Sequence, residues 1–238
     1  MTWSIIARDP TTGCLGIAVA SKFLAVGARV PHIAACVGAV ATQALVNPFY
    51  GPRGLALLRE NVPPADAVAA LVGADDGRDH RQLHLIDRTG RSAAHTGSAC
   101  IGWCGHRAGD GFSLAGNMLA GPQVLDATAA AYAANAARDL PSRLIAAMRA
   151  GEAAGGDKRG KQSAALLIYG EDEWSELDLR VDDHAEPLAE LARLEQVSRE
   201  GWVHFRKFLP SRRDPVGITD RQAIEAGIAA ALAAGAGR

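Results

Sequence analysis

The chain has 238 residues, of which 48% are hydrophobic and 5% aromatic. Its 25 basic and 26 acidic residues leave a formal net charge of −1, which excludes the strongly basic surface that attracts nucleic acids or anionic membranes. The sequence shows no secretory signal pattern and no run of roughly 18 apolar residues. We therefore expect one large globular domain in the cytoplasm, with no nucleic-acid or membrane partner.

The first twenty-two residues predict a β-hairpin. Trp3–Arg8 and Leu15–Ala20 are short apolar runs, and the segment Asp9–Gly13 between them has the Pro and Gly of a turn. Thr2 follows a single Met and is small, so we expect removal of Met1. That processing leaves an α-amine and a hydroxyl on one residue at the start of a strand.

The α-amine of an N-terminal Thr is able to act as the base that activates its own hydroxyl. Its ordinary pKa is roughly 7.7–8.0, so a sizeable fraction is unprotonated near neutral pH. The simpler interpretation of the hairpin is that Thr2 is only a β-branched residue that opens a strand. From the hairpin alone the simpler interpretation is preferred, because many chains begin in this way and a periodic pattern does not reveal chemistry.

The next segments predict further strands and a loop. Val30–Val40 is interpreted as two short strands broken near Pro31, which place four strands in one sheet. Ala41–Pro52 is interpreted as a polar loop that leads into a helix. Thr42 and Gln43 in this loop are candidates to stabilise an oxyanion or orient a substrate; the alternative is an ordinary strand-to-helix connection.

Two pairs of helices are predicted, with strands between them. The first pair is Arg53–Glu60 and a helix that starts near Pro63, and the second is Gln123–Arg138 and Pro141–Gly151. Between the pairs we expect a hairpin, an irregular Gly-rich stretch and a returning strand that leads to Asn117. In order, these are Arg81–Asp87 with Ser92–Thr96, residues 96–111, and Phe112–Gly116. His84 is expected to point outward from its alternating strand.

A charged loop flanked by glycines, Gly155–Ser163, precedes the apolar strand Ala164–Tyr169. Polar residues held at a strand end often form sites. The alternative is a solvated charge cluster, which suits Lys158 and Lys161 better than the other polar residues. Those other residues are Asp157, Arg159 and Gln162.

The sequence after Leu177–Val181, a predicted edge strand, contains Asp182, Asp183 and His184 in a row. These three residues are candidates for a divalent-metal site, but a cap for the next helix is the preferred interpretation. From Glu195 onward we expect a helical extension with exposed aromatic residues. The predicted division is residues 1–195 and 196–238, with the extension packed on the domain or on a partner subunit.

The four cysteines are interpreted as core thiols of a reducing compartment. Two of them, Cys100 and Cys104, offer a metal or redox pair as an alternative, although one pair with this spacing is weak support. The other two are Cys14 and Cys36.

Several motifs resemble one bacterial and archaeal family. They are Thr-aromatic-Ser-Ile-Ile-Ala-Arg-Asp at residues 2–9 and the segments 16–27, 39–55, 116–122, 155–166 and 178–184. This pattern, over roughly residues 2–195, is similar to the domain-of-unknown-function family 1028. The resemblance implies membership of the N-terminal-nucleophile (Ntn) hydrolase superfamily, whose members cleave amide bonds.

The resemblance and the two groups of strands separated by paired helices both imply an α+β fold. It is a four-layer αββα sandwich with two mainly antiparallel sheets between helical layers. The implied function is an amidohydrolase that cleaves a C–N bond of a small-molecule or peptide-like substrate, without a cofactor or metal. Two alternatives stay open: a binding protein on the same fold, and a metal-dependent hydrolase. A homodimer is also expected.

The resemblance also implies roles for individual residues. Thr2 is the nucleophile, and Ser21 stands where threonine members of the superfamily often have an acidic residue. A cation, Lys22, Arg29 or His32, would lower the pKa of the amine. The predicted catalytic set is Thr2, Ser21, Lys22 and Asp157, which orients the amine; the predicted substrate-binding set is Thr42, Gln43, Asn47, Asn117, Arg159, Gln162 and Ser163.

Overall fold

The computed structural model describes residues 2–236, and the side chains of residues 2–234. Its internal contacts divide the chain into two compact units, Met1–Leu191 and Ala192–Arg238. The first unit contains both sheets and carries the predicted site residues. The two units are described separately below.

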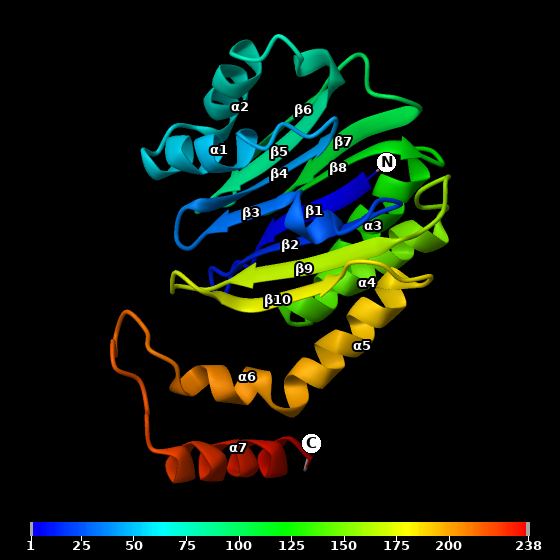
Figure 1. Cartoon of the computed structure of the whole chain (residues 1–238). Helices are drawn as coiled ribbons and strands as arrows, with labels where there is room; N and C mark the ends of the chain where they lie inside the picture. Colours follow the sequence, from blue (N-terminus) through cyan, green and yellow to red (C-terminus); the bar gives the residue numbers. More distant parts are fainter. Residues whose placement is uncertain (1, 237–238) are drawn as a thin grey trace. The chain divides into compact units, whose positions relative to one another are not determined.

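Two antiparallel sheets form the centre of the first unit (Figure 1). The six-stranded sheet has the order β10 (Ser175–Val181), β9 (Ser163–Tyr169), β2 (Leu15–Ser21), β1 (Thr2–Arg8), β8 (Phe112–Leu119) and β7 (Trp103–Gly109). The four-stranded sheet has the order β3 (Pro31–Ala34), β4 (Gly38–Ala44), β5 (Arg81–Asp87) and β6 (Ser92–Thr96).

The prediction that the first four strands share one sheet is wrong. β1 and β2 pair in the six-stranded sheet, whereas β3 and β4 pair in the four-stranded sheet. The segment between β2 and β3 contains a short 3-10 helix, η1 (Val26–Ala28), and Val26 is buried in the core between the sheets. The chain therefore changes sheets here, and the Gly-containing connection that the sequence shows is the crossing point.

Helices cover the outer faces of both sheets. α1 (Tyr50–Arg59) and α2 (Pro64–Gly73) contact the four-stranded sheet, and α3 (Gln123–Ala134) and α4 (Leu140–Ala153) contact the six-stranded sheet. The layers are therefore helix, sheet, sheet and helix, and the predicted αββα sandwich is confirmed.

Three apolar layers hold the sandwich together. One lies between the sheets and includes Ile6, Ile17 and Ile86; another, between the four-stranded sheet and its helices, includes Leu83 and Leu85. The third layer lies between the six-stranded sheet and α4. The packing there is close, because a Cβ added to Gly16 of β2 would lie only 2.7 Å from Leu144 Cδ1 of α4. Both faces of each sheet are thus buried, so alternation along a strand does not separate inside from outside.

His84 illustrates this point, because the prediction that it points outward is wrong. Its side chain is fully buried and faces the space between the sheets, whereas its neighbours Leu83 and Leu85 face the helices. Side chains alternate along β5 between a face covered by helices and a face covered by the other sheet, and both faces are buried. A polar residue on such a strand must find a partner inside the protein, because an unpaired buried polar group is costly.

Other local predictions have mixed outcomes. The hairpin of β5 and β6 and the edge position of β10 are confirmed. The stretch interpreted as irregular contains β7, an edge strand with mainly exposed small and polar residues, which gave no apolar alternation. The region interpreted as a loop from Ala41 is still strand until Ala44, and the helix after it begins at Tyr50.

The second unit is helical. α5 (Pro187–Glu200) crosses the division between the units, and α6 (Trp202–Phe205), the 3-10 helix η3 (Arg206–Phe208) and α7 (Arg221–Ala236) follow. Within this unit Phe208 lies against α7, where a Cβ on Gly227 would come within 2.6 Å of its ring. The predicted helical extension is thus present, and the surface on which it packs stays a prediction. None of the helices within residues 2–236 is long and apolar enough to span a bilayer.

Candidate active site

Thr2 lies at the start of the central strand β1, between two other strands. Its register partners are Ser21 at the end of β2 and Asn117 near the end of β8. The Thr2 Oγ1 and Ser21 Oγ atoms are 3.0 Å apart, and Thr2 is 8% exposed. The Thr2 carbonyl accepts a hydrogen bond of 3.4 Å from Gln43 Nε2 of the other sheet. The strands therefore fix the backbone of Thr2 at a position that is nearly, but not completely, buried.

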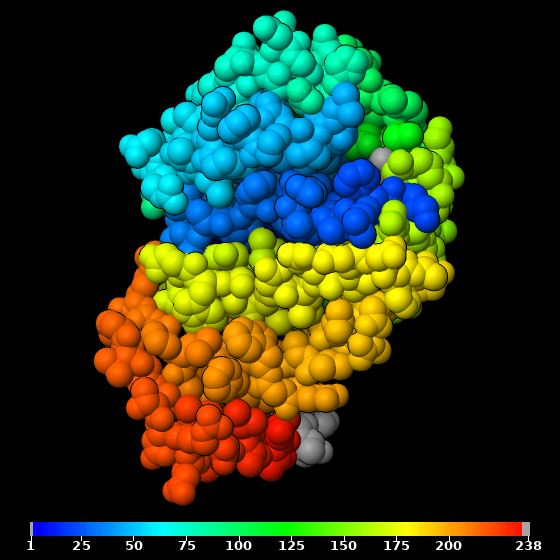
Figure 2. All heavy atoms as spheres, viewed as in Figure 1, coloured from blue at the N-terminus to red at the C-terminus, as the bar shows by residue number. Residues whose placement is uncertain are grey.

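Thr2 lines a cavity of about 510 Å³, a volume typical of small-molecule sites. Two segments that follow β2 and β4 form its walls, and they lie side by side in Figure 2, in dark and light blue. A second cavity, of about 270 Å³, shares Phe23, Ala44 and Leu45 with the first. The lining of the Thr2 cavity consists of Thr2, Ser21, Phe23, Ala28, Arg29, Val30, His32, Ala44, Leu45, Val46 and Pro48.

Two nitrogen-bearing side chains line this cavity without a protein partner. Among the described residues, the Arg29 side chain has no hydrogen bond or ion pair, and His32 Nε2 is buried without a hydrogen-bond partner. Burial lowers the pKa of His32, so its ring is neutral near pH 7. The His32 ring packs against Gly51 of α1, where a Cβ would lie 2.3 Å from it. Arg29 is therefore the permanent positive charge of the cavity.

Asp157 forms a separate cluster behind Ser21. Its carboxylate accepts hydrogen bonds from the Lys22 backbone N–H (3.0 Å) and the Arg159 backbone N–H (2.8 Å), and pairs with the Arg159 guanidinium. The Lys22 side chain extends elsewhere and donates to the Lys161 carbonyl at 3.0 Å. Asp157 thus fixes the chain just after Ser21, and the Lys22 ammonium is engaged away from Thr2.

A buried polar network that the sequence interpretation missed lies beneath Thr2, between the sheets. Ser4 Oγ donates to Gln43 Oε1 (2.7 Å) and lies 2.8 Å from His84 Nε2, and His84 Nδ1 lies 3.1 Å from Ser113 Oγ. Burial first, and then the nearby His106, lower the pKa of His84 to about 3, so the imidazole is neutral. Gln82 and His84, two polar residues at alternating positions of β5, were the sequence signal from which this network could have been predicted.

Gln82 is the centre of this network. Its Oε1 accepts hydrogen bonds from Gln43 Nε2 (2.7 Å) and Asn117 Nδ2 (3.0 Å). Its Nε2 faces Thr96 Oγ1 and the Gly116 carbonyl, each at 2.9 Å, and the Gly105 carbonyl at 3.1 Å. Gln82 therefore links the two sheets directly below the strand end that carries Thr2.

Two strand ends at the cavities have unusual backbone conformations. Ala44, the last residue of β4, has φ 67°, and Met118, near the end of β8, has φ 53°. Positive φ is costly for residues other than glycine. Ala44 lines both cavities and Met118 lines the smaller one. The strained positions thus lie at the candidate site.

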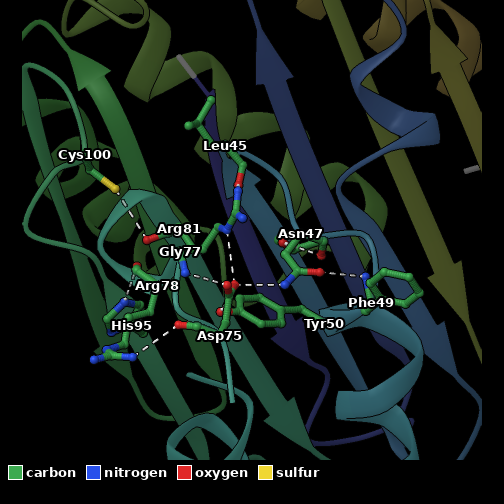
Figure 3. Close-up of polar contacts among 11 residues, drawn as sticks. Leu45, Asn47, Phe49, Tyr50, Asp75, Gly77, Arg78, Arg81, His95 and Cys100 are labelled. Atoms are coloured by element: carbon green, nitrogen blue, oxygen red, sulfur yellow. Dashed lines mark hydrogen bonds and ion pairs between the residues drawn. The ribbon is translucent and has the colours of Figure 1, made fainter. Parts of the chain in front are cut away.

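Asn47, a predicted substrate-binding residue, lies outside the Thr2 cavity in a network around Asp75 (Figure 3). The Asp75 carboxylate accepts hydrogen bonds from Asn47 Nδ2 (2.9 Å), Tyr50 Oη (2.8 Å) and Arg81 Nε (3.2 Å). Arg81 also donates to the Leu45 carbonyl at 2.8 Å. Asp75 therefore holds the segment that forms one wall of the Thr2 cavity, and Asn47 lines a different cavity beside α1 and α2.

We expect acid to destabilise the protein partly through Asp75. The hydrogen bond from Asn47, followed by that from Tyr50, holds the Asp75 pKa far below its ordinary value. A carboxyl whose folded pKa is depressed contributes stability above its unfolded pKa of about 3.9, and the contribution is lost as the pH falls toward the folded pKa. The wild type should therefore lose more stability than Asp75→Asn between about pH 5 and pH 2, measured by urea unfolding. Equal losses of stability in the wild type and in Asp75→Asn would show that protonation of Asp75 does not contribute to the acid sensitivity.

Asn117 and Arg159 of the predicted substrate-binding set line the smaller cavity, whereas Thr42, Gln43, Gln162 and Ser163 do not line either cavity. Thr42 and Gln43 lie in β4, so the loop interpretation is wrong for them; Thr42 Oγ1 donates to the Asn47 carbonyl at 3.2 Å. Ser163 Oγ accepts a hydrogen bond of 3.2 Å from the Val26 N–H of η1. The Gln162 backbone N–H donates to the Ser21 carbonyl at 3.1 Å.

The helix-cap prediction for the acidic run after β10 is wrong, because α5 begins only at Pro187. Asp182 instead pairs with Arg180 at 2.8 Å, and His184 Nδ1 accepts a hydrogen bond from the Glu186 N–H. The Arg180 hydrogen bond lowers the pKa of Asp182. In the described part of the chain, no three His, Cys, Asp or Glu side chains are grouped to hold a metal ion.

The thiols are less buried than predicted. Cys36 is exposed, and the remaining three are half-buried. Burial raises the pKa of Cys100 and of Cys104, which favours the unreactive thiol form. Cys100 Sγ donates to the Arg81 carbonyl at 3.4 Å.

Comparisons with other proteins agree with the sequence motifs. Protein SPO2555 from Silicibacter pomeroyi, whose structure carries the family assignment DUF1028, is 35% identical, with a TM-score of 0.87. That match covers 92% of this chain and 96% of the other. Anbu (ancestral β-subunit) from Yersinia bercovieri is 12% identical, with a TM-score of 0.40 over 82% of this chain and 94% of the other. No curated protein matches the chain.

The sequence profile described as "Family of unknown function (DUF1028)" matches residues 2–191. That range contains both sheets, all four covering helices and every residue of the candidate site. The chain therefore belongs to the family of unknown function DUF1028.

Proposed function

We propose that this protein is an amidohydrolase of the N-terminal-nucleophile type, with Thr2 as the nucleophile. The observation that carries the proposal is the position of Thr2, a residue that lines a cavity of about 510 Å³ at the start of the central strand. Its backbone is held by both neighbouring strands, and its hydroxyl is 3.0 Å from Ser21 Oγ. A hydroxyl fixed at a cavity wall is suited to attack a bound carbonyl.

The reaction follows from the two groups of the processed Thr2 residue. The α-amine takes the hydroxyl proton while Oγ forms a bond to the carbonyl carbon of the substrate amide. The C–N bond then breaks, the leaving amine receives the proton, and the acyl group stays on Thr2 as an ester. Water attacks this ester, with the amine again as base, and releases the carboxylic acid. No metal or cofactor takes part in these steps.

Arg29 suits the role of the supporting cation better than Lys22 or His32. Arg29 is an exposed residue of the lining of the Thr2 cavity, and its guanidinium keeps its charge at all working pH values. A nearby positive charge lowers the pKa of an amine and so increases its unprotonated fraction. Asp157 contributes indirectly, because it holds the backbone just after Ser21. We also propose a cytoplasmic location and a homodimer.

Intact-mass analysis of the purified protein tests the proposal. We expect Thr2 to be the first residue of the mature chain, because a retained Met1 would convert the required amine into an amide. Met1 itself lies outside the described residues. A control variant, Thr2→Lys, should keep Met1, since a large second residue blocks removal, and should be inactive. Full retention of Met1 on active wild-type protein would contradict the proposal.

A further inference from the structure

We infer that the Thr2 cavity binds an amide that carries both a carboxylate and an apolar chain, the chemical class of the N-acyl amino acids. Only one part of this inference, the presence of an amide bond in the ligand, rests on the proposed function. The chemistry of the ligand is argued from the lining of the cavity.

The lining contains a positive charge and no negative one. Arg29 has no partner among the described residues, and none of the described residues that line this cavity is Asp or Glu. The neighbouring cavity also contains no acidic residue, and its Arg159 is already paired with Asp157. Arg29 is an exposed residue of the lining, and a guanidinium without a protein partner favours an anion; its planar set of donors matches a carboxylate.

His32 supplies a second unpartnered group. Its Nε2 is buried without a partner, at a residue that lines the same cavity. A buried polar atom without a partner in a protein is unusual and costs free energy. Because burial lowers the pKa of this ring, the imidazole is neutral near pH 7 and adds no second charge to the cavity.

The apolar part of the ligand is indicated by the remaining lining. Val30, Val46 and Pro48 line the cavity, and at its rim Phe23 is 58% and Leu45 61% exposed. Large exposed apolar side chains beside a cavity are typical of a surface that an apolar ligand covers. These residues therefore fit an acyl chain, with the carboxylate at Arg29.

The experiment measures binding to the full-length Thr2→Ala protein, in which no turnover occurs. The probes are N-hexanoyl-alanine, its methyl ester and N-acetyl-alanine, each followed by calorimetry. We expect the hexanoyl acid to bind at least about tenfold more tightly than the ester, because only the acid pairs with Arg29. It should also bind at least about tenfold more tightly than the acetyl acid, because the longer chain buries more apolar surface.

A second substitution separates charge from packing. Arg29→Ala should abolish the preference for the acid over the ester, whereas Arg29→Lys should keep part of it. Arg59→Ala, which removes an exposed arginine from α1 outside the cavity, is the matched control and should bind as the parent does. Equal affinity for acid and ester, an acid preference that survives Arg29→Ala, or no binding of any probe would overturn the inference. A further outcome is that the wild type binds the hexanoyl acid with the expected preference and yet forms no acyl-enzyme. That result would support the proposed ligand class and contradict only the proposed hydrolysis at Thr2.

Discussion

Replacing Thr2 with Ala should abolish covalent catalysis while the protein stays folded. We expect acylation by a β-lactone to fall by a factor of about 10⁴ or more, because Oγ is the atom that forms the new bond. In the wild type, Oγ opens the lactone ring and forms an ester, so the intact mass rises by the whole mass of the probe. The strand pairs of Thr2 with Ser21 and Asn117 use the backbone, so the thermal stability should change little.

Two further variants make this result specific. Thr2→Ser keeps the hydroxyl and the amine and should retain labelling, while Thr11→Ala removes an exposed hydroxyl from the hairpin turn and should label as the wild type does. Undiminished labelling of Thr2→Ala would exclude Thr2 as the nucleophile. A folded wild type that binds ligands in the cavity yet resists every electrophile would favour a binding protein.

Gln82→Ala should cause the largest loss of stability, about 3–5 kcal/mol in the free energy of unfolding. The side chain is fully buried, and its removal takes the Oε1 acceptor from Asn117 and leaves Gln43 Nε2 only its long hydrogen bond to the Thr2 carbonyl. It also removes the Nε2 donor that faces Thr96 Oγ1 and two backbone carbonyls. Each buried polar group left unsatisfied costs about 1–3 kcal/mol. Urea unfolding measures the change through the transition midpoint.

Gln123→Ala provides the matched control within the same unit. Its side chain is exposed and makes a longer hydrogen bond, 3.3 Å to the Ala154 carbonyl, so we expect a change of at most about 0.5 kcal/mol. If Gln82→Ala lost no more stability than this control, the hydrogen bonds of Gln82 would not be needed for stability. The proposed role of Gln82 in linking the two sheets would then be wrong.

Local sequence patterns predicted much of the fold. The hairpin of β1 and β2 and that of β5 and β6 have turn residues between apolar runs, and such signals depend only on neighbours in sequence. The placement of Thr2 at the start of a strand followed from the first of these patterns, whereas the central position of that strand did not. The order of the predicted strands and paired helices along the chain, together with the family motifs, then indicated the layer order.

The rest depended on contacts between distant segments. The sequence gives no sign that the connection after Ser21 crosses between sheets, or that both faces of β5 are covered, so the burial of His84 was missed. Asn47 resembled a site residue because it lies in a polar turn. Its actual partner, Asp75, lies 28 residues away and becomes a neighbour only after α1 and α2 have packed.

The positive φ angles of Ala44 and Met118 have a consequence for attempts to engineer this protein. Glycine would relieve the strain at either position, so a selection for heat resistance alone should favour glycine there. The same substitution would free the ends of β4 and β8, which form walls of the two cavities. Gains in melting temperature obtained at these positions should therefore come with weaker ligand recognition, and a thermostable variant is better sought on the outer faces of the helices.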